Sequence, residues 1–227
     1  TSAGMVIPFL AWVAAFTACL ALQPVITLPP ETSGFHAAAI FLCGLVSYSV
    51  MIIATTYLLA GIAGRRLAWG WLLAGVVAGA AMLALPVRVG APWPAHIMLD
   101  LGAVALAGGL GMIVGRLMRR PGYLVPVLVA AGTIDIYSVF FGPTSKIMRQ
   151  PVLMSHFLFY WPLLGTDRIR GLIGIADFVF AGLLLAGAVN FGRPLFRTAA
   201  AFAAGCIVEF VALWLLPVDG LPILPFI

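Results

Sequence analysis

The chain has 227 residues, of which 63% are hydrophobic and only 8% are charged. About a quarter of the residues in a soluble globular domain are charged, so this composition excludes that class and indicates a polytopic membrane protein. Basic residues outnumber acidic ones, 12 against 7, but they fall between apolar segments and form no stripe. We therefore assign them to helix ends at the membrane surface, with the lipid bilayer rather than nucleic acid as partner.

Seven apolar segments predict an all-α fold, a polytopic transmembrane bundle of about seven spanning helices in a single membrane domain. The first four belong to an N-terminal region, residues 1–120, and the last three to an aspartate-bearing region, residues 121–227. Gly75 with Gly79, and Gly111 with Gly115, are spaced for close helix packing. The seven segments are 5–27, 35–63, 67–86, 96–115, 121–141, 171–191 and 198–216.

A shorter apolar patch, residues 152–164, lies between the fifth and sixth segments. It is too short to span a membrane and contains Pro162, so we expect an interfacial or re-entrant piece. The alternative is a membrane-surface loop anchored by Tyr160 and Trp161. The charge bias at the helix ends is weak and places the end that carries most arginines in the cytoplasm. We expect the inner or plasma membrane of a prokaryote as the location.

Two acids lie inside apolar segments, Asp135 in the fifth and Asp177 in the sixth. An ionisable group within a membrane helix costs several kcal/mol and is a functional hypothesis by default. The chain leaves and re-enters the membrane on one side, so antiparallel neighbours put both carboxylates about 9 Å below the same surface. Gly132, Gly174 and Ala176 are small enough to let the two backbones approach.

Paired carboxylates in a low dielectric share one proton, so one acts as base while the other acts as acid. This arrangement predicts aspartic proteolysis, with Asp135 and Asp177 as the dyad. A segment near the end of the chain, Leu221 to Pro225, contains two prolines and cannot form a regular helix. Its free carbonyl groups are therefore available to pair with an extended substrate strand.

Three motifs follow one another in this region: Ile-Asp-Ile-Tyr-Ser-Val-Phe-Phe-Gly-Pro-Thr at 134–144, Gly-Ile-Ala-Asp-Phe-Val-Phe at 174–180, and Leu-Pro-Ile-Leu-Pro at 221–225. They resemble the two aspartate helices and the Pro-Ala-Leu element of the presenilin and signal peptide peptidase family of intramembrane aspartyl proteases. The resemblance covers residues 121–227. It implies a presenilin-like catalytic core that cleaves single-span or signal-peptide-like helices. Its implied substrate contacts are Gly174, Ala176, Leu221, Pro222, Ile223, Leu224 and Pro225.

Two other hypotheses compete with the protease. A non-catalytic subunit of a larger membrane complex is favoured by Ile134, Ala176 and Ile223, which differ from the family pattern. The same hypothesis is favoured by the end of the chain two residues after Pro225, where the family has a last helix. A proton or cation pathway is the third hypothesis; it would use four acids in one half of the membrane, Asp100, Asp135, Asp177 and Glu209.

The remaining polar residues predict no further chemistry. Asp100 lies one turn inside its expected helix, so an interfacial or capping role is our main expectation for it. Cys19, Cys43 and Cys206 show no paired spacing and are assigned as small core residues. His96 and His156 are isolated, and no phosphate-binding loop is present, so we expect neither a metal nor a cofactor.

Overall fold

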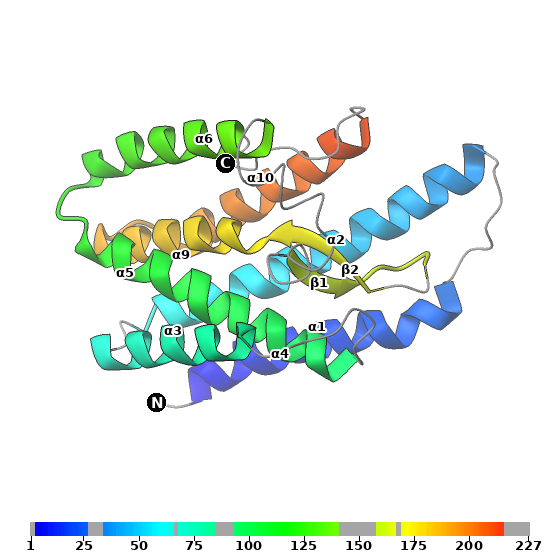
Figure 1. The fold of residues 1–227 in the computed structure, drawn as a ribbon, viewed down its shortest axis with the longest axis horizontal. Helices are drawn as coiled ribbons and strands as arrows, with labels where there is room; N and C mark the ends of the chain where they lie inside the picture. The colour runs from blue at the N-terminus through cyan, green and yellow to red at the C-terminus, as the bar shows by residue number, and fades with distance from the viewer. Residues whose placement is uncertain are drawn as a thin grey trace.

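The structure is a computed structural model that describes residues 3–26, 34–65, 68–84, 93–140, 158–166 and 169–215. Apolar helices run back and forth along one bundle (Figure 1). A single helix is formed by α4, the π-helical turn η1 and α5, and the 3₁₀ turn η2 precedes α6. The bounds are α1 Ala3–Ile26, α2 Gly34–Ala63, α3 Trp69–Leu83, α4 Trp93–Ala103, η1 Val104–Gly108, α5 Gly109–Leu117, η2 Pro121–Tyr123, α6 Leu124–Phe140, α9 Ile175–Asn190 and α10 Leu195–Leu215.

The expected apolar helices are confirmed, most of them within a few residues of the predicted ends. In the described part, four are long and apolar enough to cross a membrane: Val6–Ile26, Ala37–Ala63, Trp93–Leu117 and Leu195–Leu215. Three others are shorter: Trp69–Leu83, Pro121–Thr133 and Ile175–Asn190. Their lengths and hydropathy support a membrane-embedded protein, with four spans by length rather than seven.

A β-hairpin is the largest departure from the predicted all-α fold. Strand β1 (Leu158–Pro162) pairs antiparallel with β2 (Ile169–Gly174), and β2 passes directly into α9. Phe159 and Trp161 of β1 are fully buried, so the alternative of a membrane-surface loop is wrong for the described part of this patch, residues 158–164. Backbone groups away from water need partners, and strand pairing supplies partners to a segment that Pro162 keeps from continuing as helix.

Aromatic packing holds the hairpin inside the bundle. The indole ring of Trp161 lies edge-on to Trp12 and Phe16 of α1, with ring centroids 5.7 Å and 5.1 Å away. Phe159 contacts Phe178 of α9 at 4.9 Å. Edge-to-face pairs of this kind are favourable beyond the area they bury. The hairpin is therefore packed between α1 and the first turn of α9.

Glycines allow close contact where the helices cross, as predicted for three of the four positions. A methyl group at Gly111 would overlap the backbone of Val179 in α9, and one at Gly115 would lie 2.6 Å from the carbonyl oxygen of Leu183. At Gly79 it would lie 2.5 Å from the carbonyl oxygen of Gly102. Gly75 has nothing within 4 Å, so close packing is wrong for that position.

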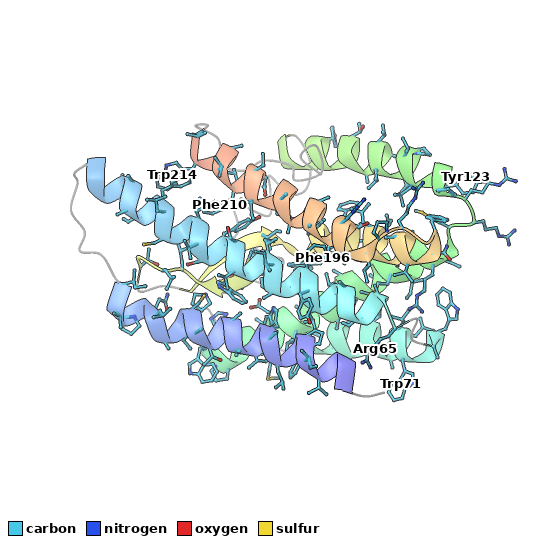
Figure 2. All side chains as sticks on the ribbon, turned by 180° about the vertical axis from the view of Figure 1, so that it is seen from behind. Arg65, Trp71, Tyr123, Phe196, Phe210 and Trp214 are labelled. Atoms are coloured by element: carbon cyan, nitrogen blue, oxygen red, sulfur yellow. The ribbon has the colours of Figure 1, made fainter. Side chains whose placement is uncertain are left out.

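The two ends of the bundle differ in their surface residues. Figure 2 shows Arg65, Trp71 and Tyr123 toward one end and Trp214 toward the other. Trp71 is 72% exposed, as expected of an interfacial tryptophan. The α5–α6 and α9–α10 connections lie at the end that carries Arg65, which we call the basic end (Figure 1). The hairpin and the start of α9 lie away from it.

Candidate functional site

Asp177 lies in the first turn of α9, where the chain changes from strand to helix. Gly174 precedes the helix with extended dihedral angles, φ −71° and ψ 142°. A methyl group on Gly174 would lie 3.3 Å from the Oδ2 atom of Asp177, closer than side chains normally tolerate. Glycine at 174 therefore leaves space for the carboxyl group. The N-terminal end of a helix also favours a negative charge, because its first N–H groups have no helical partner.

The helix begins at Ile175, four residues later than predicted, so Asp177 is its third residue rather than lying six residues inside it. The depth predicted for Asp177 was counted from a helix start at residue 171, so that prediction is wrong. The residues expected to open the helix, 171–174, are extended instead. Ala176, predicted to contact substrate, is exposed at this junction.

Buried polar side chains from two other helices surround this turn. The Tyr48 hydroxyl of α2 donates a hydrogen bond to Oε2 of Glu209 in α10, at 3.3 Å. Tyr48 is 1% exposed and Glu209 is 7% exposed. Asp177 lies close enough to Tyr48 and to Cys206 for a charge on it to act on both, as does Glu209. The charges of the half-buried Asp177 and of Glu209 thus act on the same two buried side chains, Tyr48 and Cys206.

Asp135 lies in α6, and the structure describes the backbone at position 135. The inner stripe of α6 consists of half-buried residues that pack against the core: Leu124, Val127, Leu128 and Ala131. Position 135 follows Ala131 by four residues and Leu128 by seven, so the helical register puts it on the same face. Asp135 is therefore on the side of α6 that carries the stripe.

The contact between α6 and α9 fixes how the two aspartates lie along the bundle. The Cδ1 atom of Leu124 would be 3.3 Å from a methyl group on Gly187 of α9. The two helices are antiparallel, so α6 after Leu124 and α9 before Gly187 both extend away from the basic end (Figure 1). Asp135 follows Leu124 by 11 residues and Asp177 precedes Gly187 by 10. At 1.5 Å per residue these are about 16 Å and about 15 Å, so both positions lie at nearly one level.

Three polar side chains from the N-terminal helices hold the backbone around the hairpin. Oδ1 of Asp100 in α4 accepts a hydrogen bond of 2.8 Å from the N–H of Tyr160. Oγ of Ser47 in α2 accepts one of 2.9 Å from the N–H of Leu164. Nε2 of Gln23 in α1 donates to the carbonyl oxygen of Leu163 at 3.4 Å. Residues 1–120 therefore contribute directly to the neighbourhood of Asp177.

Asp100 is not a helix cap, so that part of our expectation is wrong. Its helix begins at Trp93, which puts Asp100 two turns inside, and it is only 1% exposed. The His96 ring, one turn earlier, packs against the Tyr160 ring at a tilt of 35°, with centroids 4.9 Å apart. The three side chains that anchor the hairpin, Asp100, Ser47 and Gln23, were not predicted from the sequence. The sequence contained a signal only for the strand itself. Leu-Phe-Tyr-Trp at 158–161 is rich in the aromatic residues that strands favour.

Other sequence-based predictions have mixed outcomes. The segment Leu221 to Pro225 lies outside the described residues, as does His156. Cys19 and Cys206 are buried free thiols and Cys43 is a half-buried one, as expected of small core residues. Within the described residues, no group of three or more histidine, cysteine or acidic side chains is placed to hold a metal ion.

An apolar groove of about 620 Å³ lies between α2 and α10. It runs from Ile53 to Gly61 on α2 and from Leu195 to Ile207 on α10. The α10 side begins at the helix start near the basic end and extends to Ile207, two residues before Glu209. Its lining is mostly alanine, isoleucine, leucine and aromatic side chains, with hydroxyl groups from Thr56 and Tyr57, and suits hydrocarbon.

Comparisons of the chain with models of protein families, with curated proteins and with solved structures gave no match.

Proposed function

We propose that the protein is an intramembrane aspartyl protease that uses Asp135 and Asp177 as its catalytic dyad. The observation that carries this proposal is the common level of the two positions along α6 and α9, counted from the contact of Leu124 with Gly187. The resemblance of motifs 134–144 and 174–180 to the presenilin and signal peptide peptidase family supports it. The first-turn position of Asp177 supports it further.

The chemistry requires one ionised and one protonated carboxyl group. The carboxylate removes a proton from a water molecule, whose oxygen attacks the carbonyl carbon of the scissile peptide bond. The other acid protonates the carbonyl oxygen, which gives a tetrahedral diol. The diol then collapses: the C–N bond breaks, the leaving nitrogen takes up a proton, and a carboxylic acid and an amine result.

The hairpin provides a reason for an extended substrate to lie next to Asp177. In the described part of the chain, β2 is paired with β1 alone, so its other edge can accept a further strand. An unwound transmembrane segment needs partners for its backbone groups, and an edge strand supplies them. Because β2 ends at Gly174, a paired substrate would run toward the turn that carries Asp177.

The test is cleavage of a panel of tagged single-span substrates by the purified full chain in proteoliposomes. We expect the wild type to release a product, and Asp177→Asn and Asp135→Asn to release none, because asparagine keeps the volume but cannot transfer the proton. Thr133→Val is the matched control on α6. Thr133 is exposed, and its hydroxyl bonds only within its own helix, to the carbonyl oxygen of Val129 at 2.9 Å.

A product that persists in both asparagine variants would contradict aspartyl catalysis. If a folded wild-type protein releases no product and co-purifies in fixed ratio with other membrane proteins, the non-catalytic subunit becomes the better explanation. Thermal unfolding of each variant establishes that a lost activity is not a lost fold.

A further inference from the structure

One helix contacts both the β1–β2 hairpin and α9, the two elements that meet near Asp177. Its N-terminal half, α4, reaches β1 through the hydrogen bond from the Tyr160 N–H to Asp100. Its C-terminal half, α5, packs against α9 through Gly111 and Gly115, and α9 makes its most extensive contacts with α5. The continuous helix Trp93–Leu117 is therefore bonded to β1, the strand that pairs with β2, and is packed on α9.

Asp100 is an unexpected residue for a position that needs only to fill space. Its Oδ1 atom accepts the single hydrogen bond from Tyr160, while its buried Oδ2 atom has no hydrogen-bond partner among the described residues. A buried acid with one partner carries a desolvation cost that leucine, of nearly the same shape, would avoid. The cost is understandable if the bond to the hairpin has a role that leucine cannot fill.

The bonded strand position is also irregular. The pairing register shifts between Phe159 and Tyr160, which face Ile173 and Gly171 respectively. A bulge weakens the ladder locally and can re-aim the residues near it. A strand with a register shift needs an outside contact to fix its position, and the Asp100 carboxyl group supplies that contact.

We propose that Asp100 is a positioning residue that fixes the β1–β2 hairpin relative to Asp177. The consequence of this contact, the placement of a substrate strand, rests on the proposed protease function, but the hydrogen bond itself can be tested without activity. Ser47 and Gln23 hold the turn at Leu163 and Leu164, whereas Asp100 alone of these three anchors holds a strand residue.

The Tyr160 side chain makes a second contact. The His96 ring packs against it at a tilt of 35°, with ring centroids 4.9 Å apart, so the β1 residue bonded to Asp100 is held through its side chain as well.

The first experiment measures amide hydrogen exchange at residues 158–162 of the full chain in lipid nanodiscs. In Asp100→Leu we expect exchange of the Tyr160 amide to rise at least about ten-fold, because its acceptor is gone. In Asp100→Asn we expect exchange close to that of the wild type, because the amide oxygen can accept the same bond. Unchanged exchange in Asp100→Leu would overturn the proposal.

Asn190→Leu is the matched control. Nδ2 of Asn190 also bonds a distant backbone group, the carbonyl oxygen of Met118 at 2.7 Å, but at the opposite end of α9. Its loss should leave exchange at Tyr160 unchanged, and an equal rise there would show general loosening instead of a local contact, against the proposal. If Asp100→Leu does not fold, His96→Ala removes the stacked ring but keeps the acceptor. Exchange at Tyr160 should then rise by less than about ten-fold, and a larger rise would assign the positioning role to His96.

Cleavage kinetics give the second readout. We expect Asp100→Leu to raise KM more than it lowers kcat, since the strand that receives substrate is displaced while both aspartates remain, and we expect Asp100→Asn to restore the wild-type values. Raised exchange with unchanged kinetics would overturn the positioning role. If the wild type cleaves no substrate, the proposed function fails, and the exchange experiment still decides whether Asp100 holds the hairpin.

Discussion

The two helices that carry the aspartates are held very differently. Every residue of α9 from Ala181 to Ala188 is buried, and glycines of the crossing helix let the two backbones meet. Helix α6 touches the bundle through its inner stripe, while Val125 and Val129 on its other side are 65% and 63% exposed. Asp177 therefore belongs to a fixed part of the molecule and Asp135 to a peripheral one.

This difference indicates how a membrane protein can combine a defined site with access for a substrate. The proposed catalysis needs groups held in place, which the α5–α9 contact provides for Asp177. Admission of a peptide needs an element that can give way at low cost, and elements with few buried contacts open most easily. Helix α6 meets that description, so we expect substrate to enter on its side.

The largest expected effect on stability concerns the glycine contact between α5 and α9. Gly111→Ala places a methyl group against the backbone of Val179, which cannot move without shifting the helix. We expect a loss of about 3 kcal/mol in the free energy of unfolding. Gly75→Ala, in open space on α3, should leave the free energy of unfolding unchanged or raise it by up to about 1 kcal/mol. Reversible unfolding in detergent or bicelles measures both; equal effects would contradict the close contact.

A second test compares the same substitution on the two helices. Leu185 of α9 is fully buried and Leu128 of α6 is half-buried. We expect Leu185→Ala to cost about 2 kcal/mol of unfolding free energy, because a cavity forms, and Leu128→Ala to cost less than about 1 kcal/mol. The same unfolding assay applies. If the α6 variant costs as much as the α9 variant, α6 is not peripheral and substrate entry on its side loses its support.

The smallest expected effect concerns the polar neighbours of Asp177. Tyr48→Phe removes only the hydroxyl that donates to Glu209, and Glu209→Gln removes the acid but can keep that hydrogen bond. For a protease we expect either variant to reduce kcat by no more than about ten-fold, since both aspartates remain. A proton pathway through Glu209 predicts complete loss of proton flux in Glu209→Gln, with or without cleavage. Flux measured in the proteoliposomes used for the cleavage assay separates the two functions.

Much of the helical framework could be predicted from the sequence. Seven apolar segments were found where expected because a long uncharged run has few alternatives to a buried helix. The hairpin was not predicted. Residues 152–164 are apolar throughout and contain Pro162, so their composition fits a re-entrant piece, and burial alternates along β1 only once the strand is enclosed between α1 and α9.

The candidate site divides in the same way. Asp135, Asp177 and Gly174 were identified from the sequence, because acids are rare in apolar helices and the glycine lies within the same motif. The contacts of Tyr48 with Glu209, and of Asp100 with Tyr160, join residues that lie 161 and 60 positions apart. No local pattern connects such pairs, since each residue alone resembles an ordinary polar residue in a helix.

The sequence by itself therefore determined the class of protein, the order of its helices and the two acids most worth testing. These follow from local composition and from the cost of a charge in an apolar helix. The tertiary structure alone decided that α9 is fixed and α6 peripheral, that strand β2 leads into the helix of Asp177, and that Asp100 bonds the neighbouring strand β1. Such features depend on which backbones can meet, and that is a property of packing between distant segments.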